Sequence, residues 1–300
     1  MYVLSLFDGL SGGQIALQRA GIKVGNYYAS EIDPYGIAVA KYNYINTIHV
    51  GDVTKLKASR LPKIDLLIGG SPCQSFSNAG KGEGFDGESG LFREYYRLLK
   101  ELQPKYFLLE NVKMKMAWRN LITARLFTVP IEINSSRVSA QLRSRLYWTN
   151  IPKVRQPKDK GMVVEDILEP GIPFTEVLPK EGWSYVSDNQ FADVRGKAYC
   201  LRANAGGVNS GRGITDGKYW RKLTVLECER LQTLPEGYTE FGDFSNTREC
   251  DANKERVQIS NTQRHKMIGN GWTIDVIAHI FSNIPRENKK VKRIKLRRIN

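Results

Sequence analysis

Short apolar runs alternate with helix-like segments over the first part of the chain, and this alternation allows few architectures. The apolar runs cover residues 3–7, 25–30, 64–68 and 106–109. Helix-like stretches lie between them, at 14–20, up to residue 44 and at 91–102. The runs end in glycine or acidic residues. Such alternation with polar strand ends predicts an open α/β sheet that binds its ligands at the carboxyl ends of the strands.

The pattern changes after Tyr147. Residues 152–219 show no clear periodicity, contain several prolines and include a glycine-rich segment at 204–217. These features predict a small, loop-rich insert. Helical patterning returns at 224–232 and at 272–281, so the chain is expected to return to the first domain after the insert.

The chain is strongly basic, with a net charge of +14 and a pI of about 9.6. Such a protein usually binds a polyanion, and nucleic acid is the first candidate, although charge alone does not separate DNA from RNA or an anionic membrane. The basic end of the chain, residues 285–300, is either a solvated terminus or a phosphate-binding arm.

No apolar run approaches the roughly 20 residues of a membrane span, and the first residues lack a basic leader. The four cysteines form no C-x-x-C pair, which argues against a zinc site and a disulfide framework. We therefore expect a soluble, cytoplasmic protein without a metal.

A glycine-rich turn, FDGLSGG at 7–13, follows the first apolar run. Glycine allows a tight turn and a close approach of the backbone to a ligand. Glu31 ends the next run, where an acidic residue would bind ribose hydroxyls, and Asp52 ends a third candidate strand. A dinucleotide dehydrogenase or a purely structural turn would fit these residues as well. The departure from G-x-G-x-x-G mildly favours a ligand without phosphate.

Cys73 follows the run at 64–68 in a polar turn, Ser-Pro-Cys-Gln, beside a glycine-rich loop at 80–90. A lone cysteine is more often a small buried hydrophobe than a nucleophile. Here the loop is a candidate lid, and Arg143 and Arg145 are candidates to favour the thiolate. Glu110 follows another apolar run, and a carboxyl group buried there could donate a proton, although alone it would be better interpreted as an exposed acid.

These segments together resemble the cytosine-C5 DNA methyltransferase family. The matches occur in the family's order along most of the chain: FDGLSGG, Glu31, GDVT, GGSPCQSFS, GLF, ENV, QLRSR, RKLTVLECERLQTLP and MIGNGW. The segment SSRVSAQLRSRLYWTNIP and the tryptophan of GNGW are similar to the branch that contains phage enzymes and animal de novo enzymes. Ser11 and Ile32 depart from it, since many members have glycine and some have tryptophan at these positions.

The resemblance implies a reaction that agrees with the residue chemistry. Cys73 would add to C6 of a flipped-out cytosine, Glu110 would hold and protonate N3, and Arg145 would contact O2. Arg143 is placed with these catalytic residues as a support for the loop and backbone, and Gln141 would order the same region. S-adenosylmethionine is the implied cofactor, and the residues implied to bind it are Phe7, Gly9, Leu10, Gly12, Glu31, Ile32, Asp52, Val53, Pro72, Asn270 and Trp272.

The implied fold is α/β: a Rossmann-like methyltransferase sheet with a small loop-rich target-recognition domain. The expected units are a catalytic domain at 1–150, a recognition insert at 151–220, a returning segment at 221–284 and the basic tail. A helix containing Arg221, Glu227, Arg230 and Gln232 would orient the insert, or would be an ordinary amphipathic helix. The expected partner is double-stranded DNA, bound by a monomer, and the candidate DNA contacts are Gln74, Ser77, Gln141, Arg202, Asn204 and Arg212.

Two alternatives remain open. An RNA-directed member of the same chemical class would carry the same cysteine and glutamate, although the insert favours DNA. A non-catalytic nucleic-acid-binding module would be indicated by a changed Cys73 or Glu110, and both residues are present.

Overall fold

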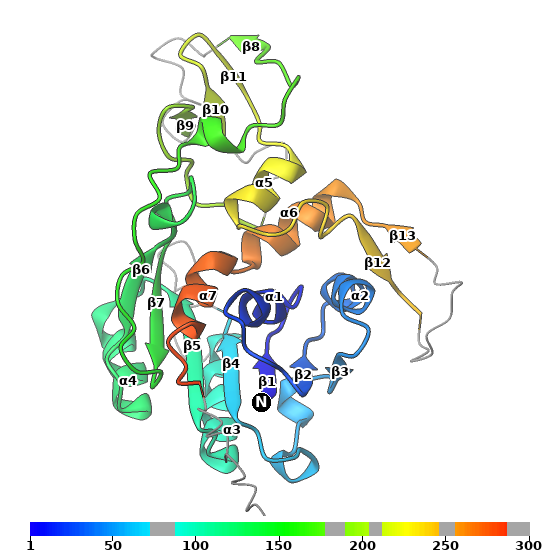
Figure 1. Cartoon of the computed structure of the whole chain (residues 1–300), viewed down its shortest axis with the longest axis vertical. Coiled ribbons are helices and arrows are strands. Elements are labelled where there is room, and N and C mark those ends of the chain that lie inside the picture. The colour runs from blue at the N-terminus through cyan, green and yellow to red at the C-terminus, as the bar shows by residue number, and fades with distance from the viewer. Residues whose placement is uncertain (73–87, 178–189, 204–211, 246–255, 287–300) are drawn as a thin grey trace, which may run out of the picture.

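The computed structural model describes residues 1–72, 88–177, 190–203, 212–245 and 256–286. A seven-stranded sheet forms its centre, in the order β3-β2-β1-β4-β5-β7-β6 (Figure 1). The strands are β1 (Tyr2–Leu6), β2 (Asn26–Ser30), β3 (Ile48–His49), β4 (Leu66–Gly70), β5 (Tyr106–Val112), β6 (Ile131–Asn134) and β7 (Ser144–Thr149). The first five are parallel, whereas β7 runs antiparallel to both β5 and β6. The expected α/β class is confirmed.

Helices cover both faces of this sheet. One face packs against α1 (Gly12–Arg19), α2 (Pro34–Asn43) and α7 (Ile274–Phe281), and the other against α3 (Phe92–Leu102) and α4 (Met116–Leu126). Helices α5 (Val225–Leu231) and α6 (Asn261–Asn270) pack against each other, between the main sheet and the upper end of the molecule in Figure 1. Successive side chains of β4 enter different cores: Leu66 and Ile68 pack with α1 and α7, and Leu67 packs with α3 and α4. A strand buried on both faces carries apolar residues at successive positions, which explains the apolar runs of the sequence.

A second, four-stranded sheet lies at the far end of the molecule, at the top of Figure 1. Its strands are β8 (Glu176–Val177), β9 (Gln190–Asp193), β10 (Arg212–Thr215) and β11 (Tyr219–Arg221), in the order β8-β11-β10-β9. The predicted loop-rich insert therefore contains short strands. A separate hairpin, β12 (Phe241–Asp243) and β13 (Arg256–Gln258), lies against α2.

The sequence patterns did not indicate several of these elements. Strands β6 and β7 and helices α4 and α6 were not predicted, and the candidate strand before Asp52 is only the two residues of β3. Strand β5 also extends to Val112, so Glu110 lies within the strand instead of at its end. The reason is its pairing with β7, which places Glu110 opposite Tyr147 and Val112 opposite Arg145.

The insert is joined to the edge of the large domain by backbone hydrogen bonds. Ala198 N donates to Ala140 O at 2.7 Å, and Leu142 N donates to Ala198 O at 2.8 Å. Within the described ranges, no helix is long and apolar enough to cross a membrane, and no group of His, Cys, Asp and Glu side chains is arranged to hold a metal ion.

Candidate active site

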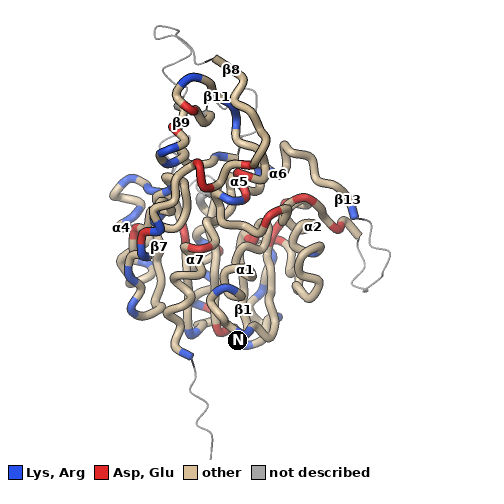
Figure 2. The backbone as a smooth tube through the Cα atoms, turned by 45° about the horizontal axis from the view of Figure 1, so that its top comes forward, with Lys and Arg blue, Asp and Glu red and all other residues tan. Residues whose placement is uncertain are grey.

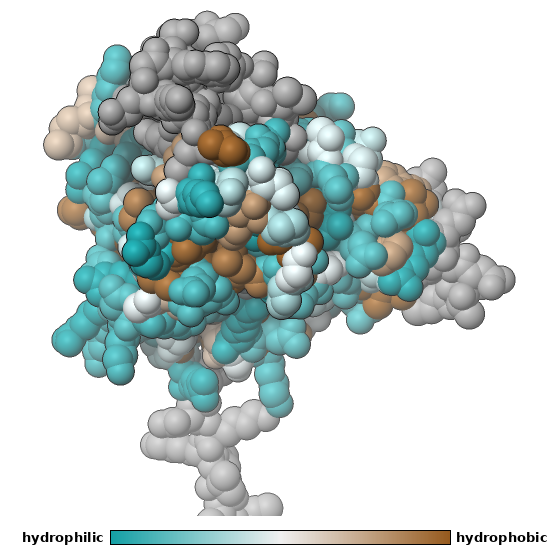
Figure 3. All heavy atoms as spheres, turned by 90° about the horizontal axis from the view of Figure 1, so that it is seen from above, coloured by the Kyte–Doolittle hydropathy of each residue, from teal (hydrophilic) through white to brown (hydrophobic). Residues whose placement is uncertain are grey.

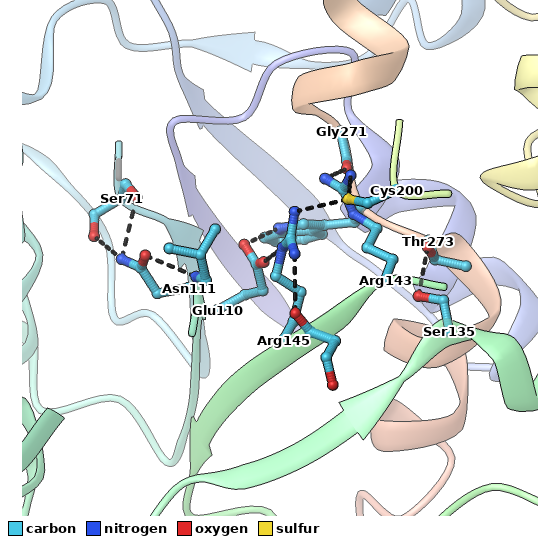
Figure 4. Close-up of polar contacts among 12 residues, drawn as sticks. Ser71, Glu110, Asn111, Ser135, Arg143, Arg145, Cys200, Gly271 and Thr273 are labelled. Atoms are coloured by element: carbon cyan, nitrogen blue, oxygen red, sulfur yellow. Dashed lines mark hydrogen bonds and ion pairs between the residues drawn. The ribbon is translucent and has the colours of Figure 1, made fainter. Parts of the chain in front are cut away.

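Glu110 of β5 lies where three parts of the chain meet (Figure 4). Its Oε1 is 3.2 Å from Nε of Arg145 on β7, and its Oε2 accepts a hydrogen bond of 3.0 Å from Nε1 of Trp272. The residue is 9% exposed. The structure thus brings together three residues that the sequence analysis selected separately, and it holds the carboxylate at both oxygens.

Gly70, the last residue of β4, makes this arrangement possible. It lies opposite Glu110 in the parallel register of β4 and β5. A Cβ atom at this position would stand 2.8 Å from Oε2 of Glu110 and 2.9 Å from Nε1 of Trp272. A side chain at this position would therefore displace Glu110 and Trp272. Glycine is required because these two side chains lie so close to the backbone.

Arg143 and Arg145 point from the same region of the chain but have different surroundings. Arg143 is 4% exposed, and it donates to the carbonyl oxygens of Leu201, Gly269 and Gly271 at 2.9–3.1 Å. It therefore ties the insert to α6 and is a supporting residue. Arg145 retains 15% side-chain exposure and reaches Glu110. Burial lowers the pKa of Arg143, helped by the charge of Arg145.

The residues just before Cys73 are held by Asn111. Its Nδ2 donates to Oγ and O of Ser71 at 3.1 and 3.3 Å, and its own Oδ1 accepts from Val112 N at 2.8 Å. Ser71 and Asn111 are both buried. Cys73 itself lies outside the described residues, so the placement of the predicted nucleophile stays a prediction.

The turn after β1 is attached to the end of β2 by Glu31. One carboxylate oxygen accepts from Gly9 N at 2.7 Å, and the other accepts from the backbone N–H groups of Ile32 and Asp33 at 2.8 and 2.9 Å. Gly9 has φ +57°, a left-handed conformation that favours glycine. Glu31 is therefore held firmly where the sequence predicted a ribose-binding carboxylate.

Ser11 also has a left-handed conformation, with φ +60°, just before α1. Its hydroxyl donates to Oδ2 of Asp8, whose Oδ1 accepts from the hydroxyl of Tyr27 at 2.6 Å. This conformation gives a physical reason for the glycine that many family members are expected to have here. Burial raises the pKa of Asp8 to about 6, although these hydrogen bonds act to lower it. Asp8 stands in the glycine-rich turn, but no pattern in the sequence marks it as a buried acid.

The other predicted cofactor residues differ in exposure, and Phe7 and Pro72 are partly buried. Ile32 is 72% exposed, and Asn270 is also exposed. Asp52 is half-buried; Thr54 donates to its Oδ1 twice, which lowers the pKa of Asp52. The buried positions are Leu10, Gly12 and Val53. A Cβ atom at Gly12 would stand 2.8 Å from Cδ1 of Ile274, so the start of α1 packs closely against α7.

A buried polar network places the returning segment beside the site. Gln232 Nε2 donates to the carbonyl oxygens of Ile268 and Gly271 at 2.8 and 3.1 Å, and its Oε1 accepts from Thr273 at 2.8 Å. Thr273 in turn accepts from Ser135 at 2.8 Å. Sequence reasoning missed Ser135 and Thr273, because single hydroxyl residues carry no pattern.

The predicted DNA contacts are only partly within the described structure. Gln74, Ser77, Asn204 and the side chain of Arg212 lie outside it. Arg202 is exposed. The prediction for Gln141 is wrong, because its side chain is fully buried and its amide bonds to Leu231 O, Gln232 and Leu201 N. It joins elements of the site instead of reaching solvent.

The surface charge agrees with the basic composition. Lysine and arginine residues occur along α4, near β7 and around the small sheet in Figure 2, whereas acidic residues gather near α5 and α2. The view from above shows a mainly hydrophilic face with separate apolar patches (Figure 3).

Comparisons with known proteins agree on one family. Residues 1–128 match the model of the C-5 cytosine-specific DNA methylase family. The Type II methyltransferase M1.ScrFI of Lactococcus lactis subsp. cremoris is 29% identical over 96% of this chain and 79% of that protein. The Type II methyltransferase M.HhaI of Haemophilus parahaemolyticus is 27% identical over 94% of this chain and 93% of that protein.

A solved structure supports the fold. The S. pombe Dnmt2 methyltransferase superposes with a TM-score of 0.69 at 18% sequence identity, over 94% of this chain and 97% of that chain. The recognised sequence motifs, the sheet and the full-length matches lead to the same conclusion. Residues 1–128 match the C-5 cytosine-specific DNA methylase family, the chain is similar along almost its whole length to type II methyltransferases, and proteins of this family use S-adenosylmethionine.

Proposed function

We propose that this protein methylates C5 of a cytosine within a short site in double-stranded DNA, with Cys73 as the nucleophile. The observation that carries the proposal is the contact of Glu110 with both Arg145 and Trp272, beside Gly70, the last residue of β4, which precedes Cys73 in the chain by three positions. A carboxyl group held beside an arginine, two strands from the cofactor turn, fits the recognition of the N3 and O2 edge of a cytosine.

The residues of the first turn fit the cofactor. The carboxylate of Glu31 is fixed by three backbone donors and suits ribose hydroxyls, and the exposed Ile32 offers an apolar face to adenine. Both bonds from Thr54 go to Oδ1 of Asp52, so Oδ2 is suited to accept from the adenine amino group. S-adenosylmethionine, when bound, supplies the electrophilic methyl group.

The chain's own residues carry the remaining chemistry. The thiolate of Cys73 adds to C6 of the cytosine. Glu110 takes up a proton from solvent when the base binds and gives it to N3, so that negative charge does not accumulate on the ring. Arg145 donates to O2. After C5 is methylated, water accepts the C5 proton, and the C5–C6 double bond forms again as the sulfur of Cys73 is expelled by β-elimination. N3 then returns its proton to Glu110. Because C5 is inaccessible in a stacked duplex, the base must first be flipped out, which costs a few kcal/mol.

The proposal also assigns a role to each part of the chain. Residues 1–150 and 221–284 would form the catalytic domain, and 151–220 would read the DNA sequence, with Arg202, Asn204 and Arg212 as candidate contacts. Gln74 and Ser77 are further candidates in the catalytic domain. The exposure of Arg202 supports its role as a DNA contact. We expect a cytoplasmic monomer.

The test is methyl transfer from radiolabelled S-adenosylmethionine to unmethylated mixed-sequence DNA and, separately, to unmodified tRNA, followed by nucleoside analysis. Label in 5-methyldeoxycytidine is expected. Label only in tRNA would replace the DNA proposal with the RNA-directed alternative.

Two variants test the assigned chemistry in the same assay. Cys73→Ala should abolish transfer and leave the dissociation constant of S-adenosylmethionine unchanged, whereas equal loss of both would indicate a folding role. Asp52→Ala should raise that dissociation constant first. Together, the two variants distinguish loss of the nucleophile from loss of cofactor binding.

A further inference from the structure

Cys200 brings a thiol from the insert to the two arginines near Glu110 (Figure 4). Its Sγ accepts from Nη1 of Arg143 at 3.4 Å and from Nη2 of Arg145 at 3.7 Å, and the thiol form donates to Leu201 O at 3.4 Å. The residue is partly buried. The mechanism proposed above does not use this thiol.

The backbone around Cys200 is fixed to the catalytic domain. Leu201 N donates to the buried Oε1 of Gln141 at 2.9 Å, and Leu201 O accepts from Arg143 at 2.9 Å. A Cβ at Gly269 of α6 would lie 2.2 Å from Arg202 O, so the chain just after Cys200 is also in close contact with that helix. The sulfur is therefore held in a defined position relative to Arg145.

Near Glu110, the two arginines carry more positive charge than one carboxylate can neutralise. Arg143 and Arg145 are two cations, and the carboxylate of Glu110 is paired with Arg145. Burial opposes ionisation of Cys200, but the charges of Arg143 and Arg145 outweigh it and hold the pKa of its thiol below the ordinary value. A thiolate at Cys200 would provide the second negative charge.

This second charge matters at the step in which Glu110 engages the cytosine. A carboxyl group that shares its proton with N3 attracts Arg145 less strongly. Of the contacts described here, Arg145 then keeps Ser144 O, at 2.9 Å from its Nη1, and the sulfur of Cys200. Of these two groups, only the sulfur of Cys200 can carry a negative charge.

We propose that Cys200 is a positioning residue for methyl transfer: its sulfur holds the guanidinium of Arg145 in place, as a second counter-anion, while Glu110 engages the base. The inference rests on the proposed function, because it assigns Cys200 a part in that reaction.

The kinetic test compares single-turnover rate constants of methyl transfer to DNA at saturating S-adenosylmethionine. Cys200→Ala and Cys200→Ser should lower this constant about tenfold or more, since each removes a charged hydrogen-bond partner. Cys200→Asp should recover most of the rate by restoring the charge. The dissociation constant of S-adenosylmethionine and the unfolding midpoint should remain those of the wild type.

Cys228→Ala is the matched control, because Cys228 is a buried cysteine of α5 and the charges of Glu227 and Glu229 help burial to raise its pKa. Its unfolding midpoint should fall while its rate constant stays unchanged. A wild-type rate in Cys200→Ala, or a loss in Cys200→Asp as large as in Cys200→Ala, overturns the proposal.

A second measurement needs no enzymatic activity. The rate of iodoacetamide alkylation at Cys200, followed by peptide mass spectrometry against pH, reports the thiolate fraction. The midpoint should lie below about 8.5 in the wild type and should rise in Arg145→Ala. A wild-type midpoint at or above that value overturns the proposal. Absence of methyl transfer by the wild type would refute the proposed function instead, and the alkylation result would still decide the pairing.

Discussion

Nε1 of Trp272 donates a hydrogen bond of 3.0 Å to Oε2 of Glu110, although 162 positions separate the two residues in the chain. The tryptophan comes from the segment that returns after the insert, immediately before α7. Through this one bond the last part of the chain sets the orientation of a carboxylate in the first domain. The site is therefore complete only when the returning segment is docked.

Trp272→Phe removes this bond and keeps most of the ring. We expect the single-turnover rate of methyl transfer to fall about tenfold, because the lost donor served a charged acceptor. Quench-flow kinetics at saturating cofactor measures this. The unfolding midpoint serves as the control, and a full rate in the variant would show that the bond does not orient Glu110 during the reaction.

Gly70→Ala tests the close approach at the end of β4. The new Cβ would stand 2.8 Å from Oε2 of Glu110, and we expect a loss of about 1–3 kcal/mol in the free energy of unfolding together with slower transfer. Chemical denaturation and the transfer assay measure the two effects. Gly196→Ala is the control, since the nearest atom to its Cβ would be Asp193 O at 3.4 Å. Equal effects at both glycines would contradict the steric argument.

The sequence predicted the parallel half of the sheet better than the antiparallel half. Strands such as β4 are buried on both faces and therefore form apolar runs, whereas β7 begins with the polar, partly buried residues Ser144 and Arg145. Helix α6 was missed for a related reason: its buried residues are only Met267, Ile268 and Gly269, too few to form an apolar stripe.

The sequence predicted which residue types form the site. It did not predict how those residues contact one another. Glu31, Glu110 and Arg145 stand in recognisable local motifs, so their chemistry could be expected. The contacts of Cys200 with the arginines, and the burial of Gln141, depend on how the insert packs against β7 and α6. Periodicity within a segment carries no information about such distant packing.

Asp8 predicts a pH dependence of stability at the cofactor turn. Its pKa is about 6 in the folded protein because of burial, against an ordinary value of 3.8. The folded state thus binds this proton more tightly than the unfolded state. The resulting stabilisation is fully present below pH 3.8 and is lost as the pH rises through about 6, on the order of 3 kcal/mol in total.

The measurement is urea unfolding of the wild type and of Asp8→Asn at pH 4.5 and pH 7.5. The free energy of the wild type relative to the variant should fall between the two pH values. The variant keeps a carbonyl acceptor for Ser11 or Tyr27 and has no charge, so it isolates the titration. A difference independent of pH would contradict the raised pKa.

The ion pair of Arg221 and Glu227 yields the last prediction. Arg221 donates to both carboxylate oxygens of Glu227, at 2.7 and 2.8 Å, at the junction between β11 and α5. The glutamate is fully buried and also accepts from Glu169 N and Thr224 N, both at 2.9 Å. Glu227→Gln leaves the guanidinium of Arg221 buried without its counter-charge.

We expect this variant to lose about 3–5 kcal/mol in the free energy of unfolding, because removing one partner of a buried pair leaves an uncompensated charge. Asp193→Asn is the matched control: its partner Arg195 has 77% side-chain exposure, and such surface pairs contribute little. Denaturant unfolding should show a large shift for Glu227→Gln and none for the control. Equal shifts would mean that burial of the pair is unimportant, and then α5 would not be fixed to the insert by this charge pair.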